Sequence, residues 1–77
     1  ALIRMDPGCG YPTHRHHSTE EVLVVRGGYE DELGTYVAGQ HVRYEAGTEH
    51  GPRATGKPGD TPCVLLALAH EGIKLLS

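Results

Sequence analysis

Four residues of the kinds that bind transition metals occur at spacings that can bring them together. His14 and His16 are two residues apart, so on a β-strand both side chains project to one face, and Glu20 keeps the same parity. His50 follows after a glycine-rich segment that can return the chain to this face. Neutral imidazole and carboxylate together suit first-row divalent ions such as Zn, Fe, Mn and Ni. The pattern predicts one divalent metal ion on His14, His16, Glu20 and His50.

Other residues of the same types fit this group less well. His17 and Glu21 are out of phase with the paired histidines, so their side chains should point away from the group. We therefore prefer Glu20 to Glu21 as the carboxylate ligand and leave His17 outside the site. His41 and His70 belong to no ligand pattern and are interpreted as surface residues.

The ligand set leaves the role of the metal open. An octahedral ion with these four ligands would keep two adjacent positions for water, substrate or dioxygen. It could polarise an enolate or carboxylate oxygen, or lower the pKa of a bound water. A tetrahedral zinc ion would instead be closed and structural. Val22 and Val24 share the parity of Glu20, and Tyr44 lies on the strand leading to His50, so these three residues are predicted to line a pocket beside the metal.

Length and composition bound the fold and the partners. We expect one domain, 1–77, which buries only about 60% of the surface that its unfolded chain exposes and therefore needs a metal, a disulfide or a partner subunit. The net charge is −3 with no basic stripe, and no apolar run approaches the roughly 18 residues of a membrane span, so neither nucleic acid nor membrane is expected as a partner. Cys9 and Cys63 are interpreted as separate reduced thiols of a cytoplasmic protein.

Short strand-like runs alternate with turns rich in Gly and Pro, which is typical of an all-β sandwich or barrel. The run 22–25 and the later run 64–69 are apolar on both faces, and the face that does not line the barrel needs a cover, so we predict a homodimer. Glu30-Asp31-Glu32 is interpreted as a solvated hairpin and Arg43 as part of a salt bridge at the rim. The predicted strands are 2–5, 13–16, 21–26, 28–31, 34–36, 40–44, about 48–50, 64–69 and 73–75.

The spacing of these ligands and glycines resembles the two motifs of the cupin superfamily. The first motif, Gly-x5-His-x-His-x3-Glu-x6-Gly, is matched at every position over 8–27. The second, Gly-x5-Pro-x-Gly-x2-His-x3-Asn, runs over 39–54 and supplies His50. Glu45 stands at its Pro position and Ala54 at its Asn position, so the two departures leave the ligands untouched.

Within the superfamily, the chain is similar to the cupin domain of ChrR-type anti-sigma factors, from about Met5 to Leu68. The resemblance implies a small, single-domain, antiparallel β-barrel of the jelly-roll type with the metal inside it. It implies zinc on the four ligands named above, with iron, manganese or nickel in relatives. The sigma-contacting activity of that family belongs to a separate helical domain without a counterpart in this sequence, so we do not expect the chain to act as an anti-sigma factor unless it is a fragment of a longer protein. The stretches that carry the likeness are Pro7-Gly8, Tyr11-Pro12, His14, His16, Glu20-Glu21, Leu23-Val24, the run from Tyr29 to Gly39, Arg43, Gly47 and His50.

Three functions are compatible with these features. The first is a metal-binding cupin that binds or senses a small molecule in its barrel without turnover. The second is a metal-dependent enzyme, either a dioxygenase that cleaves a small diketone or phenolic ketone or an isomerase. The third is a barrel in which the metal only stabilises the fold. In each of them, metal affinity should fall as the pH drops through the histidine range, because protons compete for the imidazoles.

Overall fold

The computed structural model describes residues 2–69, with His14 described by its backbone alone. Across this range the secondary structure consists of strands only, and no helix is long and apolar enough to cross a membrane. The all-β class predicted from the sequence is therefore confirmed. The strands are β1 (Leu2–Met5), β2 (His14–Arg15), β3 (Glu20–Arg26), β4 (Gly28–Asp31), β5 (Gly34–Val37), β6 (His41–Tyr44), β7 (Glu49–His50), β8 (Arg53–Ala54) and β9 (Cys63–Ala69).

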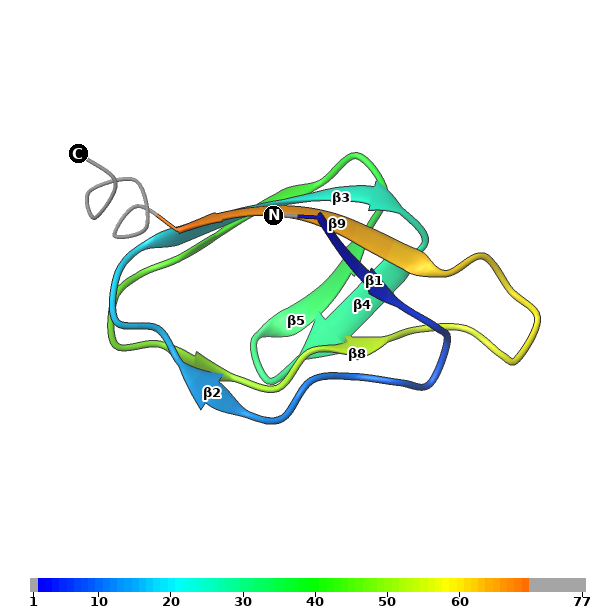
Figure 1. Ribbon diagram of the computed structural model, residues 1–77, viewed down its shortest axis with the longest axis horizontal. Helices are drawn as coiled ribbons and strands as arrows, with labels where there is room; N and C mark the ends of the chain where they lie inside the picture. The colour runs from blue at the N-terminus through cyan, green and yellow to red at the C-terminus, as the bar shows by residue number, and fades with distance from the viewer. Residues whose placement is uncertain (1, 70–77) are drawn as a thin grey trace.

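The strands form two opposed layers in which all pairing is antiparallel. One layer is a four-stranded sheet in the order β1-β9-β3-β6. A three-stranded sheet, β5-β4-β8, and the pair β2-β7 make up the remainder. Figure 1 shows β2 and β8 on the side of the molecule opposite to β3 and β9. Sequence-distant strands are neighbours in the four-stranded sheet, as in antiparallel barrels of the jelly-roll type.

The core lies between these layers and takes alternate residues of the strands, because successive side chains point to opposite faces. In β3, Val22 and Val24 are buried, whereas Leu23 and Val25 are exposed. The same alternation runs along β9. The buried hydrophobic residues are Met5, Val22, Val24, Tyr29, Tyr44, Ala54, Cys63, Leu65 and Ala67. This small core is aliphatic apart from its two tyrosines and the sulfur-containing Met5 and Cys63.

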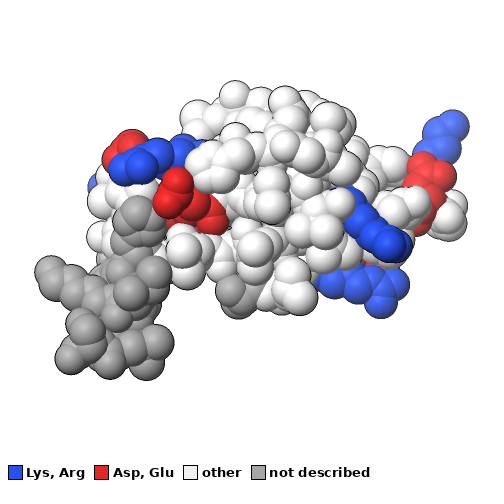
Figure 2. All heavy atoms as spheres, turned by 90° about the horizontal axis from the view of Figure 1, so that it is seen from above, with Lys and Arg blue, Asp and Glu red and all other residues white. Residues whose placement is uncertain are grey.

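The outer face of the four-stranded sheet is also apolar. Leu2, Leu66 and Leu23 follow one another across β1, β9 and β3, and Val25 and Leu68 extend this group, which we call the outer apolar patch. Its members are between 40% and 72% exposed. Figure 2, which views the molecule from the side where β3 and β9 lie in Figure 1, shows an uncharged centre with charged side chains toward both ends. The sequence prediction that these strands are apolar on both faces is confirmed.

Gly27 is the single residue between β3 and β4, where the chain passes from one sheet to the next. Its φ of +64° lies in the left-handed region that side chains other than glycine rarely adopt. A Cβ atom at this position would lie 2.7 Å from the carbonyl oxygen of Pro62. Both the conformation and the close approach therefore require glycine here.

Most of the predicted strands are present, with ends that differ by no more than one residue. One observed strand, β8, was not predicted from the sequence, because a strand of two residues is too short to show alternation. The strand predicted at 73–75 lies outside the described residues. Glu20 and His50 thus lie on the strands expected of them, whereas His16 follows directly after β2.

Candidate metal centre

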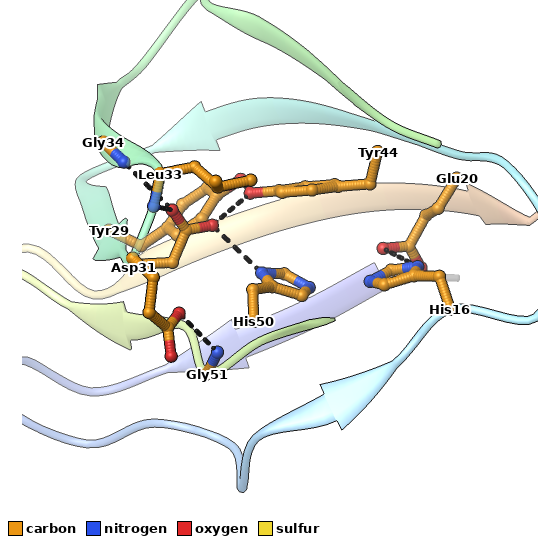
Figure 3. Close-up of polar contacts among 10 residues, drawn as sticks. His16, Glu20, Tyr29, Asp31, Leu33, Gly34, Tyr44, His50 and Gly51 are labelled. Atoms are coloured by element: carbon orange, nitrogen blue, oxygen red, sulfur yellow. Dashed lines mark hydrogen bonds and ion pairs between the residues drawn. The ribbon is translucent and has the colours of Figure 1, made fainter. Parts of the chain in front are cut away.

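Three of the four predicted ligands converge at one end of the barrel. His16 follows β2 directly, Glu20 opens β3 and His50 closes β7. One potential ligand atom from each residue can be chosen so that all three lie within 4.8 Å of one another. His16 and His50 are 8% and 3% exposed, and Glu20 is half-buried. Figure 3 shows the three side chains pointing toward a common region. Two imidazoles and a carboxylate at this separation are a donor set that fits a divalent transition metal.

Backbone hydrogen bonds hold the loop that precedes His50 against the segment of His16. The amide of His16 donates to the carbonyl of Thr48 at 2.9 Å, and the amide of Gly47 donates to the carbonyl of His16 at 2.8 Å. Gly47 has a φ of +91°, so glycine allows the turn that brings these groups into register. The two motifs are therefore joined by the backbone itself.

His14 occupies the register position expected of a ligand. In the β2-β7 pair it lies directly opposite His50, and Arg15 lies opposite Glu49. Its side chain lies outside the described part of the chain. The assignment of His14 as the fourth ligand therefore stays a prediction, for which the backbone provides the required proximity.

Aromatic rings and a carboxylate pack around the two described histidines. Nδ1 of His16 lies 3.4 Å from Oε1 of Glu20. The ring of Tyr44 stacks on both imidazoles, with centroid distances of 5.3 Å to His16 and 4.2 Å to His50. The two imidazole centroids are 4.8 Å apart. These contacts hold the rings on the inner side of the barrel.

Asp31 corrects one interpretation made from the sequence. The run Glu30-Asp31-Glu32 was expected to form a solvated hairpin, and Glu30 and Glu32 are indeed exposed. The side chain of Asp31, however, is completely buried and its Oδ2 lies 3.0 Å from Nδ1 of His50. Strand parity was the signal that could have revealed this, because Asp31 lies two residues after the buried Tyr29 in β4 and so shares its face.

The carboxylate of Asp31 is surrounded by hydrogen-bond donors. Its Oδ1 accepts hydrogen bonds from the amides of Leu33 at 2.9 Å and Gly34 at 3.2 Å, while its Oδ2 accepts one from the hydroxyl of Tyr44 at 2.5 Å. Burial raises the pKa of Asp31, but the hydrogen bonds from Tyr44, Leu33 and His50 outweigh it and hold the pKa below its usual value. Asp31 is therefore an ionised group beside the candidate metal centre.

The hydroxyl groups of Tyr29 and Tyr44 meet at 2.6 Å behind this carboxylate. Burial raises the pKa of both phenols, and for Tyr44 the hydrogen bond to Asp31 raises it further. Both hydroxyls therefore keep their protons and serve as hydrogen-bond donors. Sequence reasoning placed Tyr44 near the site but did not identify Tyr29 as part of it.

A small pocket adjoins Glu20 and His50, two of the three potential ligands. Its volume is about 110 Å³, somewhat below the ~150 Å³ of an apolar cavity that holds benzene. Glu20 and His50 form part of its wall, so a molecule in the pocket would lie beside the metal centre. The remaining wall is mainly apolar and consists of Ile3, Tyr11, Val22, Tyr29, Pro52, Leu65 and Ala67.

Residues 1–69 match the family described as the ChrR Cupin-like domain. The chain belongs to this family. No curated protein sequence matches it. This ChrR-like cupin domain is similar to the anti-sigma factor ChrR of Rhodobacter sphaeroides, whose structure was solved in complex with SigE. The identity is 29% and the TM-score 0.80, over 88% of this chain and 36% of the other.

Two further structures show the same fold. An RmlC-like cupin protein of Ralstonia eutropha is 23% identical with a TM-score of 0.78, over 88% of this chain and 44% of that one. KdgF of a Halomonas species is 24% identical with a TM-score of 0.62, over 86% of this chain and 63% of that one. The ChrR-like cupin domain therefore spans between about one third and two thirds of the length of these proteins. The cupin fold inferred from the motifs is confirmed.

The remaining predicted residues of the ChrR-like cupin domain fall in three environments. Val22 lines the pocket, whereas Val24 and Tyr44 are fully buried and do not belong to its wall. His17 and His41 are exposed, as expected. His70 lies outside the described residues.

Two other interpretations concern residues away from the ligand group. Arg43 forms an exposed ion pair with Glu45 at 2.8 Å, in agreement with the predicted rim salt bridge. Cys9 is an exposed thiol and Cys63 a buried one, and neither forms a disulfide. These residues give no sign of a role at the metal centre.

Proposed function

We propose that this chain is a metal-binding, ChrR-like cupin that holds one divalent ion on His14, His16, Glu20 and His50 and binds or senses a small molecule in the adjoining pocket. The observation that carries the proposal is the convergence of ligand atoms from His16, Glu20 and His50 to within 4.8 Å. Their spacing in the two cupin motifs, and the position of His14 opposite His50, support the same assignment.

Zinc is the metal that we propose, with iron, manganese or nickel as alternatives. Imidazole and carboxylate are ligands that all four ions accept, so the donor set fits each of them. Three neutral imidazoles and one carboxylate would leave a divalent ion with one net positive charge. The carboxylate of Asp31 beside His50 offsets this charge, so the coordinate bond to the ion would hold an oxygen donor, and the wall formed by Val22 and Leu65 favours an apolar remainder of that molecule. We therefore propose a small organic acid or enol with a short apolar part as the ligand class.

Enzymatic turnover is the second candidate function. It is favoured by the position of Glu20 and His50 in the wall of the pocket, which would put a bound molecule next to the ion. An octahedral ion with four protein ligands keeps two adjacent coordination positions. The corresponding reactions are dioxygenase cleavage of a small diketone or phenolic ketone, or an isomerase-type proton transfer.

The first test is the metal content of the untagged protein, measured by mass spectrometry. Variants Glu20→Ala and His50→Ala should lose the metal. Glu21→Ala and His41→Ala are matched controls, because these two residues form a pair with 3.2 Å between Nε2 and Oε1 that is separate from the ligand group. Stoichiometric zinc favours binding or sensing, whereas iron, manganese or nickel favours the enzyme and makes a diketone screen the next step. Absence of metal from the folded wild-type protein would refute the proposed centre.

We also propose that a second copy of the chain covers the outer apolar patch. Five exposed aliphatic residues on one sheet face are unusual for so small a domain, and dimerisation would add the burial that it lacks. The test is sedimentation equilibrium of the wild type and of Leu66→Glu, which places a charge in the centre of the patch. The matched control is Leu33→Glu, at an exposed leucine in the β4-β5 turn. A monomeric wild type at micromolar concentration would refute the dimer.

The proposal includes a cytoplasmic location and excludes nucleic acid and membranes as partners. Cys9 and Cys63 are both reduced, which is typical of proteins from reducing compartments. The negative net charge and the scattered basic residues offer no surface suited to a phosphate backbone. Binding to duplex DNA at low salt would contradict this part of the proposal.

A further inference from the structure

We propose that Asp31 is a positioning residue that holds the imidazole of His50 as its Nδ1–H tautomer and so presents Nε2 to the metal. This inference rests on the proposed function, in which His50 is a ligand. The contact that carries it is the 3.0 Å distance between Nδ1 of His50 and Oδ2 of Asp31. The two side chains are 4% and 0% exposed, so bulk water does not compete for this hydrogen bond.

The surroundings of Asp31 decide which group donates. Oδ1 of Asp31 accepts hydrogen bonds from the amides of Leu33 and Gly34, which can only donate, and Oδ2 accepts one from the hydroxyl of Tyr44, so both carboxylate oxygens act as acceptors. Nδ1 of His50 must therefore carry the proton in this contact. A neutral imidazole has one protonated nitrogen, so the lone pair that a metal requires resides on Nε2.

Tyr44 fixes the same pair from a second direction. Its single hydroxyl proton is directed to Asp31, so the hydroxyl of Tyr29 is the donor in the 2.6 Å contact between the two phenols. The ring of Tyr44 also stacks on the ring of His50 with centroids 4.2 Å apart. The hydroxyl thus orients the carboxylate, while the ring limits the tilt of the imidazole. Figure 3 shows this arrangement of Tyr29, Tyr44, Asp31 and His50.

The backbone explains why Asp31 is held so firmly. It ends β4, and its Oδ1 accepts the amides of Leu33 and Gly34 in the turn that leads to β5. Asp side chains commonly close turns in this way. Here the same carboxylate closes the turn with one oxygen and reaches His50 with the other. The hairpin is therefore the support of the metal ligand, although it contributes no ligand itself.

The test compares Asp31→Asn with the wild type and with Glu30→Gln, a neighbouring exposed carboxylate that undergoes the same chemical change. Long-range ¹H–¹⁵N correlation spectra of the metal-free proteins report which nitrogen of His50 is protonated. Zinc affinity is measured by competition with a chromophoric chelator. We expect Nδ1–H in the wild type and in Glu30→Gln. Asp31→Asn should shift the tautomer toward Nε2–H and bind zinc about 10–100-fold more weakly.

Tyr44→Phe is the second variant, in case Asp31→Asn does not fold. It keeps the ring against His50 and removes only the hydroxyl, so it should weaken zinc binding less than Asp31→Asn does. The inference is overturned if His50 of the wild type is protonated on Nε2, or if folded Asp31→Asn binds zinc within twofold of the wild type. If the wild type binds no metal, the proposed function fails, and the tautomer still decides whether Asp31 sets the orientation of His50.

Discussion

Replacement of His50 by alanine should destabilise the fold as well as remove the metal. The imidazole is 3% exposed, stacks on Tyr44 and contacts the tilted ring of His16, and an aromatic pair contributes about 0.5–1.5 kcal/mol. Its loss also takes one hydrogen bond from the buried carboxylate of Asp31, at about 1–3 kcal/mol. We therefore expect the metal-free variant to lose roughly 3 kcal/mol of its free energy of unfolding.

The assay is unfolding of wild type and His50→Ala by urea and by heat, followed by circular dichroism, once with a chelator and once with zinc. A domain of this size shifts its Tm by about 4–8 °C per kcal/mol, so the metal-free variant should melt roughly 12–24 °C lower. Zinc at about one hundred times its Kd should add about 2.7 kcal/mol to the wild type and nothing to the variant. The control is His41→Ala, whose exposed pair with Glu21 is worth at most about 1 kcal/mol.

Two results would refute this reasoning. If His50→Ala keeps both its melting temperature and its metal, the assignment of His50 as a buried ligand is wrong. If it loses the metal but keeps its metal-free stability, the packing of His50 against Tyr44 and Asp31 contributes nothing to the fold. The comparison with and without zinc separates the two cases.

Four further predictions concern residues outside the ligand group. Burial raises the pKa of Cys63 above the ordinary 9.0, so iodoacetamide should alkylate the exposed Cys9 in the folded protein and Cys63 only after unfolding, as mass spectrometry of peptides can show. Above pH 9 the unfolded chain loses the Cys63 proton while the folded state keeps it buried. This thiol therefore contributes stability that is present below pH 9 and lost as the pH rises above it. In urea titrations, the free energy of unfolding of a Cys63→Ala variant should fall less steeply at alkaline pH than that of the wild type. Gly27→Ala should lower the urea midpoint strongly or prevent folding, because its φ is +64° and the new Cβ would lie 2.7 Å from a carbonyl oxygen; unchanged stability would contradict the close approach. Tyr29→Phe should cost about 1 kcal/mol by calorimetry through the lost hydrogen bond to Tyr44, and an effect below about 0.3 kcal/mol would show that this contact is not formed.

The fold was predictable to a large extent because its strands are short, alternating and separated by glycine and proline. Val22 and Val24 point inward and Leu23 outward, as parity requires. The two-residue strand β8 escaped prediction because its pairing with β4 comes from tertiary structure and leaves no periodic pattern. Local sequence therefore defined the strands but not every partner.

The candidate ligands were predictable because they occur at characteristic spacings along the sequence. His16, Glu20 and His50 belong to two motifs, and the backbone bonds between Gly47 and His16 bring those motifs together. Asp31 was misinterpreted because it lies between two other carboxylates in the sequence, and a run of three charged residues suggested that all three side chains are exposed to solvent. Parity with the buried Tyr29 outweighed charge in the folded chain, since four hydrogen-bond donors compensate the burial of the carboxylate.

The network around Asp31 links stability and metal binding through the same atoms. Two backbone amides, a phenol and an imidazole converge on one carboxylate, so a change at any of them alters the turn, the core and the candidate ligand together. Such a network is favourable only when every member is satisfied, because an incomplete buried network costs more than an apolar core. Metal binding should therefore reduce the local opening of the β4-β5 turn, although none of the proposed ligands lies in this turn. Slower amide exchange at Leu33 and Gly34 in the presence of zinc, with no change at the exposed turn around Gly59, would demonstrate this coupling; equal exchange rates with and without zinc would show that the turn and the centre are independent.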